Sequence, residues 1–201
     1  ALDYAAAAEL FEAANSLYSL RPEAFLQLGS VYSNLGRADE SAVAFQDALD
    51  LLEESREMSM ADTALAGTWE QHWEIASLGL GQALQISEQW PEAAEHYGKL
   101  LAEDPENTQL IGSLASVLTE MEMPDSVDAL YDNLLNRPGL TEFDFSNAGV
   151  GLYRIEEYGR AAQAFRSAAE MNPFNRDARQ NLAMTLFAAE DWEALIPAAR
   201  D

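Results

Sequence analysis

The sequence contains no cysteine and only two histidines, His72 and His96, among its 201 residues. The absence of cysteine excludes disulfides, thiolate metal sites and cysteine nucleophiles. It fits a reducing cytoplasm, and a periplasmic or extracellular module without disulfides would have the same composition. The two histidines lie far apart along the chain and form none of the short histidine motifs of zinc sites. The sequence therefore predicts no metal, no cofactor and no catalytic residues.

Long apolar runs and basic residues are also scarce. No uninterrupted apolar stretch approaches the roughly 20 residues of a membrane-spanning helix, so no membrane insertion is expected. The 35 acidic residues outnumber the 11 basic ones, which gives a net charge of -24, and Lys99 is the only lysine. Such a surface repels phosphate backbones and anionic lipids, and this argues against a nucleic-acid partner.

The acidity is uneven and has two readings. Residues 1–136 hold 25 acidic and 4 basic side chains, whereas residues 137–201 hold 10 and 7. The charge is either a solubilising coat, as in proteins of salty habitats, or an attraction for a basic partner. Composition alone leaves both readings open.

What the sequence does contain is a repeat of 34 residues. Small residues recur at that spacing at Gly81, Ala115, Gly149 and Ala183. Aromatic residues keep the same spacing from Phe11 to Phe45, and from Tyr97 to Tyr131 to Phe165. Between Phe45 and Tyr97 the gap is 52, which is one repeat plus 18 additional residues. A fixed period of this length is the signature of a helical repeat array.

The pattern resembles the tetratricopeptide repeat, whose consensus runs W-x2-L-G-x2-Y…A-x3-F…P over 34 residues. In residues 142–175 the matching positions are Phe145, Gly149, Leu152, Ala161, Phe165, Ala168 and Pro173. Further full copies are expected at 22–55, 74–107 and 108–141, with partial copies at 1–21 and 176–201 and a helical insertion at 56–73. The resemblance implies one all-α, right-handed superhelical solenoid of antiparallel helix pairs, with the first helix of each pair on the concave side.

About eleven helices follow from the repeat and its proline and glycine breakers. Their expected ranges are 3–18, 22–35, 38–57, 61–86, 90–103, 107–121, 124–136, 142–155, 158–171, 175–188 and 191–200. No breaker interrupts residues 50–57, and residues 63–86 continue without proline from a candidate N-cap at 61–63, so the insertion should lengthen two helices rather than form a loop. Trp69 and Trp73 lie one turn apart within it and are expected to pack on neighbouring helices, with ligand stacking as the alternative.

The resemblance also implies a binding surface. In peptide-binding members of the family, an asparagine on the first helix of a repeat often hydrogen-bonds the ligand backbone. Asn147 and Asn181 stand at that position in adjacent repeats, 34 residues apart. The residues expected to face the groove beside them are Phe143, Val150, Tyr153, Arg154, Gln180, Met184 and Phe187.

The sequence thus predicts a non-catalytic scaffold that binds an extended, partly apolar peptide segment of a partner protein in its groove. One alternative is a targeting or regulatory region of a larger enzyme. Another is a structural spacer that self-associates through its ends, because an uncapped solenoid exposes apolar surface there.

Overall fold

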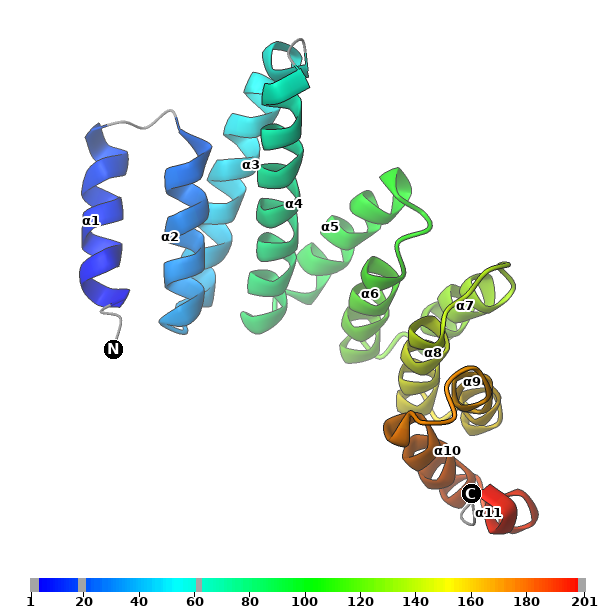
Figure 1. The fold of residues 1–201 in the computed structure, drawn as a ribbon. Helices are drawn as coiled ribbons and strands as arrows, with labels where there is room; N and C mark the ends of the chain where they lie inside the picture. The colour runs from blue at the N-terminus through cyan, green and yellow to red at the C-terminus, as the bar shows by residue number, and fades with distance from the viewer. Residues whose placement is uncertain (1–3, 18–20, 61–62, 199–201) are drawn as a thin grey trace. The chain divides into compact units, whose positions relative to one another are not determined.

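The computed structural model describes residues 4–17, 21–60 and 63–198, and these residues form eleven α-helices and no strand (Figure 1). The helices are α1 (Tyr4–Leu17), α2 (Pro22–Asn34), α3 (Ala38–Met60), α4 (Thr63–Ile86), α5 (Trp90–Glu103), α6 (Thr108–Glu120), α7 (Pro124–Leu135), α8 (Glu142–Arg154), α9 (Tyr158–Met171), α10 (Arg176–Ala188) and α11 (Trp192–Ala198). The expected all-α class and the number of helices are confirmed. Helix boundaries agree with the expected ones to within three residues, and the expected ends at 3, 18, 61 and 199–200 lie outside the described residues.

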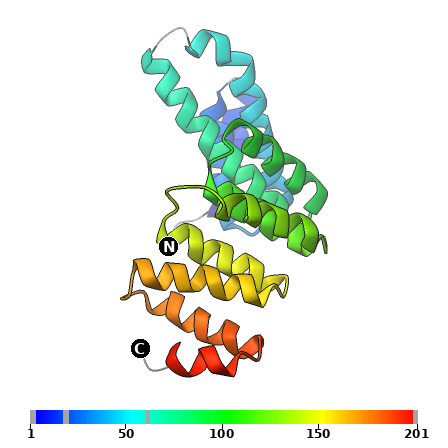
Figure 2. The same ribbon diagram turned by 90° about the vertical axis from the view of Figure 1, so that its right-hand side faces the viewer.

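The chain divides into two compact units, which we call the N-terminal unit (Ala1–His96) and the C-terminal unit (Tyr97–Asp201). Within each, successive helices run antiparallel and pack as neighbours, as α2 with α3 and α8 with α9 (Figures 1 and 2). The handedness of a superhelix and the division into one solenoid with the stated repeats stay predictions.

In the N-terminal unit the additional residues lengthen α3 and α4, which lie side by side (Figures 1 and 2). The Trp69 side chain on α4 is buried and its indole N–H donates to the backbone oxygen of Leu52 on α3 at 2.7 Å. Trp73 stacks on Trp69 with 5.0 Å between ring centroids. Trp69 therefore joins the two long helices, as the packing interpretation predicted, and Trp73 stacks on it within α4.

The repeat glycines let aromatic side chains approach helix backbones. A Cβ added to Gly149 on α8 would lie 2.7 Å from the Phe165 ring of α9, and one on Gly29 would lie 2.9 Å from the Phe45 ring. Any larger residue would require these rings to move, and buried side chains have little room to do so. The glycine and the aromatic of the repeat thus act as a packed pair.

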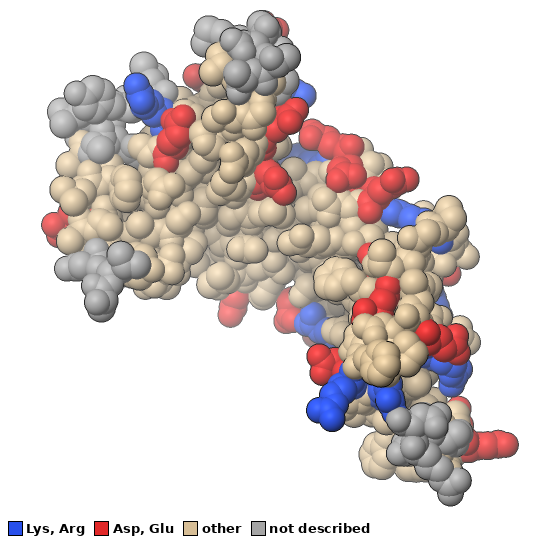
Figure 3. All heavy atoms as spheres, in the orientation of Figure 1, with Lys and Arg blue, Asp and Glu red and all other residues tan. Residues whose placement is uncertain are grey.

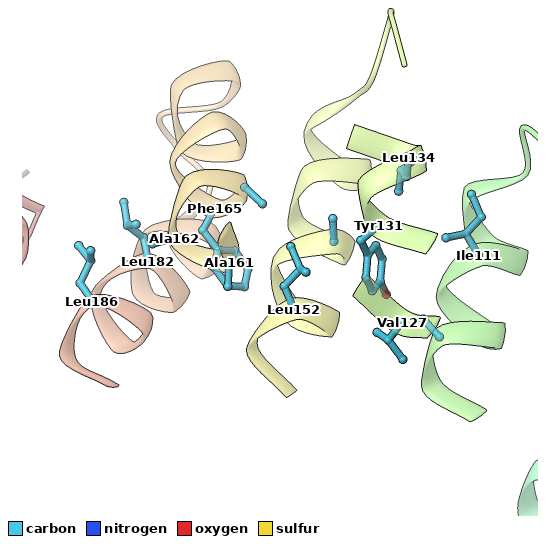
Figure 4. Close-up of a cluster of buried hydrophobic side chains, with 13 residues drawn as sticks. Ile111, Val127, Tyr131, Leu134, Leu152, Ala161, Ala162, Phe165, Leu182 and Leu186 are labelled. Carbon is cyan, nitrogen blue, oxygen red and sulfur yellow. The ribbon is translucent and has the colours of Figure 1, made fainter. Parts of the chain in front are cut away.

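The core of the C-terminal unit runs through its successive helices (Figure 4). Each helix pair alone could not bury its apolar face, and stacking joins the faces into one core. The large or central members of this core are Ile111, Val127, Tyr131, Leu134, Leu152, Phe165, Leu182 and Leu186.

The turn between the two helices of a repeat contains a residue with positive φ. Glutamates take this left-handed conformation at Glu88, Glu122, Glu156 and Glu190, with φ between 55° and 65°. They lie 34 residues apart, and Gly36 occupies the equivalent turn of the first full repeat with φ 72°. A non-glycine residue is strained in this region by contact between its Cβ and the backbone.

Candidate functional site

Two helices of the C-terminal unit carry all nine predicted groove residues. Phe143, Asn147, Val150 and Arg154 are spaced by four, three and four residues, which places them on one face of α8. Tyr153 lies on the same helix, and α10 carries Gln180, Asn181, Met184 and Phe187.

Both helices begin at well-formed caps. The Thr141 hydroxyl accepts from the backbone N–H of Asp144 at 3.3 Å, and the Asp144 carboxylate accepts from the Thr141 backbone at 2.7 Å. Burial alone would raise the pKa of Asp144, but hydrogen bonds from Thr141 and Thr108 outweigh it and hold this pKa below its usual value. At α10 the Asn175 side chain accepts from the backbone N–H of Ala178 at 3.0 Å. These caps fix where each helix starts and hence which face it presents.

A cavity of about 150 Å³ opens between α8, α9 and α10. Its lining consists of Val150, Tyr153 and Arg154, Phe165, and Asn181, Met184 and Thr185. Five of the nine predicted residues therefore meet around one space. An apolar cavity of about 150 Å³ holds a benzene ring in another protein core, so this one has room for a single apolar side chain.

Large apolar side chains are exposed beside the cavity. Phe143 and Phe187 are each 63% exposed, Met184 is 51% exposed and Val150 is 46% exposed. The Phe187 ring also packs edge-on against Trp192 at 5.3 Å. Exposed apolar surface of this kind is typical of a contact surface.

The two asparagines have different surroundings. Asn181 lines the cavity. The Asn147 amide instead packs against α6, where its nitrogen lies 2.6 Å from the position that a Cβ on Gly112 would take. A larger residue at position 112 would require this amide to move. The structure therefore gathers Asn181 with the cavity residues and places Asn147 at the neighbouring helix, with Gln180 exposed on α10.

The cation of the predicted groove already has partners. The Arg154 guanidinium donates to the Ser116 hydroxyl at 3.0 Å and to the Glu120 carboxylate at 2.5 Å, both on α6. Glu120 and Arg154 are 34 residues apart and so hold equivalent positions in adjacent repeats. Opposite charges at that spacing were a usable signal in the sequence. We missed Ser116 and Glu120, as well as Phe165 and Thr185 of the cavity wall.

The two histidines belong to the N-terminal unit. The His96 Nε2 lies 2.8 Å from the backbone oxygen of Ser77, and the His72 Nδ1 lies 3.9 Å from a Glu23 carboxylate oxygen. Within 4–17, 21–60 and 63–198, no three histidine or acidic side chains are grouped as a metal site would require. None of the helices described has the length and apolar character needed to cross a bilayer.

Comparisons with known proteins agree with this fold. Residues 147–200 match the family model described as tetratricopeptide repeat. A search of curated proteins gave no match. Among solved structures, the C-terminal part of a TPR repeat-containing protein from Cytophaga hutchinsonii has a TM-score of 0.68 at 17% identity, covering 98% of this chain and 75% of that one.

Two further solved structures are similar over most of their length. YrrB, described as a TPR protein with an unusual peptide-binding site, has a TM-score of 0.57 at 20% identity, covering 95% of this chain and 89% of that one. MamA has a TM-score of 0.59 at 17% identity, covering 85% and 90%. At these identities the likeness concerns the fold alone.

Proposed function

Since the chain has the tetratricopeptide-repeat fold and carries the family's sequence pattern in residues 147–200, we propose that it is a non-catalytic scaffold that binds a peptide segment of a partner protein along α8 and α10. Proteins with this fold generally bind other proteins and are generally not enzymes. The partner segment lies extended across the two helices, with one apolar side chain in the cavity.

The observation that carries this proposal is the cavity itself. Its apolar wall, from Val150, Phe165 and Met184, provides a pocket for a side chain, and the Asn181 amide beside it can hydrogen-bond a peptide group. The exposed Phe143 and Phe187 extend the apolar surface beyond the pocket. A likeness to YrrB, which is named for a peptide-binding site, adds support by analogy.

The ion pair of Arg154 indicates which residues the bound peptide segment needs. Because Glu120 neutralises the guanidinium, a carboxylate of the ligand would have to compete with an ion pair that is already formed. We therefore expect the segment to be held by its apolar side chain and its backbone, with no acidic residue required opposite Arg154.

A matched pair of methionines tests the groove once a partner has been isolated by pull-down from the source lysate. Met184→Ala should weaken binding by about 1–2 kcal/mol, because a buried methionine contributes about 1.5–3 kcal/mol of apolar contact. Met171→Ala is the control, since Met171 is similarly exposed, at 54%, but lies on α9 away from the cavity lining. Equal affinities of the two variants would contradict the proposal.

The asparagines are tested together. Asn147→Ala with Asn181→Ala should weaken binding by about 1–3 kcal/mol through lost amide hydrogen bonds, with an unchanged far-ultraviolet circular dichroism spectrum. The two single variants then show how much each asparagine contributes to binding: Asn181, which lines the cavity, and Asn147, which packs on Gly112. If the double variant binds an authenticated partner as the parent does, the groove is not the binding site.

A further inference from the structure

We propose that a second cavity, in the N-terminal unit, binds an arginine side chain from a basic segment of a partner protein. This cavity, of about 280 Å³, lies between α2 and α3 and is lined by Phe25, Leu28, Tyr32, Asp39, Glu40, Val43, Ala44 and Asp47. Sites for small molecules usually measure about 300–1,000 Å³, so its volume suits one or two side chains. None of its residues belongs to the groove along α8 and α10.

The floor of the cavity is apolar. Leu28, Tyr32 and Ala44 are buried in a cluster with Ala8 of α1, while Val43 is 61% exposed at the cavity. The aliphatic stem of an arginine can cover such a surface while its charged end stays at the rim. Both parts of an arginine side chain thus find a matching surface.

Three carboxylates line the cavity together with these apolar side chains. Glu40 pairs with Arg37 at 3.0 Å, and Asp39 accepts from the neutral Gln89 amide at 3.1 Å. Asp47 has no cationic partner among the described residues. Burial and then the charge of Asp50 raise the pKa of Asp47, so an arriving cation would stabilise its ionised form.

The chain itself shows that a guanidinium is accepted beside this cavity. The Arg37 guanidinium lies over the Tyr32 ring, 4.5 Å from its centroid, while it pairs with Glu40. A planar guanidinium can stack on an aromatic ring and bind a carboxylate at the same time, which an ammonium group does less well. The chemistry of the site therefore favours arginine over lysine.

The repeat supplies a second, independent argument. In the C-terminal unit Arg160 on α9 forms ion pairs with Asp128 and Asp132 on α7, and these pairs join the two helices. The repeat spacing, 34 residues and 52 across the insertion, makes Glu40 the equivalent of Arg160 and Glu12 the equivalent of Asp132. The equivalent of Asp128 is Ala8, so the N-terminal unit has Glu40 and Glu12 where the C-terminal unit has Arg160 and Asp132. Glu40 pairs with the nearby Arg37, and Glu12 accepts from the Tyr32 hydroxyl. A partner's arginine would supply the cation between helices that Arg160 supplies in the C-terminal unit.

Charge complementarity extends over the whole unit. Residues 1–96 carry 17 acidic and 3 basic side chains, so a basic segment is attracted before it makes contact. This supports the second reading of the acidity, the attraction of a basic partner, for the N-terminal unit.

The test uses the full chain labelled with ¹⁵N and the peptide acetyl-Ser-Gly-Arg-Leu-Arg-Gly-Ser-amide at low salt. We expect chemical-shift changes centred on the amides of Val43, Ala44 and Asp47. Replacing both arginines by citrulline, which keeps the shape and removes the charge, should weaken binding by about tenfold, the effect of one charge-assisted hydrogen bond. Asp47→Asn should weaken it by a similar factor.

The control is Glu54→Gln, which removes the same charge from an exposed position of α3 outside the cavity lining and should change the affinity less than about twofold. Should Asp47→Asn not fold, Val43→Ser tests the contact of the arginine's aliphatic stem with the same cavity, and unchanged affinity of this variant would contradict the proposal. The proposal is overturned by no detectable binding, by equal effects of Asp47→Asn and Glu54→Gln, by equal binding of the citrulline peptide, or by shifts confined to other helices. Occupation of the cavity by a second copy of the chain, seen as dimer formation that competes with the peptide, overturns it as well.

Discussion

At the scale of single residues, the turn glutamates are the least expected feature. The 34-residue spacing of the glycine and aromatic positions was visible in the sequence, but the left-handed conformation of Glu88, Glu122, Glu156 and Glu190 was not. Glutamate has no preference for positive φ, so nothing in its chemistry predicts the conformation. Gly36 in the equivalent turn was the available signal, since glycine is the usual residue there.

This strain can be removed at one position. Glu122→Gly should stabilise the fold by about 0.5–1 kcal/mol, because relief of the left-handed strain exceeds the greater flexibility of glycine in the unfolded chain. Urea unfolding followed by circular dichroism measures the change. Glu122→Gln is the matched control, because it removes the charge and keeps the backbone strain, and its effect should be clearly smaller. A destabilised Glu122→Gly variant would show that the glutamate makes a compensating contact.

A buried tyrosine gives a prediction for alkaline solution. Burial raises the pKa of Tyr131 from 10 to about 12, with the Arg154 charge acting weakly in the opposite direction. Above pH 10 the unfolded chain therefore loses the tyrosine proton while the folded chain keeps it, and stability falls as pH rises from 10 towards 12. The slope from this residue approaches about 1.4 kcal/mol per pH unit. In Tyr131→Phe the loss of stability over this interval should be smaller, and an unchanged slope would argue against the raised pKa.

At the scale of helices, the sequence predicted the helix ranges better than it predicted the side-chain contacts of the candidate site. The ranges of α5 (Trp90–Glu103) and α9 (Tyr158–Met171) agree with the expected ones at both ends, because proline, glycine and an initial aromatic mark their limits. The end of α3 was placed three residues too early, since nothing in residues 50–60 stops a helix. Helix periodicity placed Phe143 and Val150 on one face, but it could not show that Asn147 packs on Gly112 or that Arg154 pairs with Glu120. Those contacts depend on the neighbouring helix.

The two long helices depend on one tryptophan. Trp69→Phe should destabilise the fold by about 1–3 kcal/mol, because it removes the hydrogen bond to Leu52 and leaves part of a buried volume empty. Trp73→Phe changes the same stack from its half-buried side and should cost less than about 1 kcal/mol. Chemical unfolding of both variants gives the comparison. Equal losses would mean that the hydrogen bond and burial of Trp69 are not what holds α3 to α4.

At the scale of the whole molecule, the main feature is the large negative net charge and its effect on the stability of the fold. On the face that Figure 3 shows, basic side chains gather over the C-terminal helices among acidic ones. The net charge of -24 repels itself in the folded chain more than in the expanded unfolded one. Raising sodium chloride from about 10 mM to about 1 M shortens the screening length from about 30 Å to about 3 Å. The melting temperature should therefore rise with salt.

The salt prediction needs a control for ion identity. Potassium chloride should give the same rise if screening is the cause, and a variant with several exposed glutamates replaced by glutamine should respond less. A melting temperature that stays level or falls between low and high salt would show that favourable ion pairs, such as Arg160 with Asp132, outweigh the general repulsion.

The local nature of the contacts has a consequence for how the chain reaches its fold. The side-chain hydrogen bond between Gln89 and Asp39 joins residues 50 positions apart in the sequence. The ion pair of Arg154 with Glu120 joins residues 34 positions apart. Contacts between sequence neighbours need only short loop closures, so folding should be fast and can start in either unit. Native-state hydrogen exchange should then reveal two opening free energies, one for residues 1–96 and one for residues 97–201, instead of a single global value.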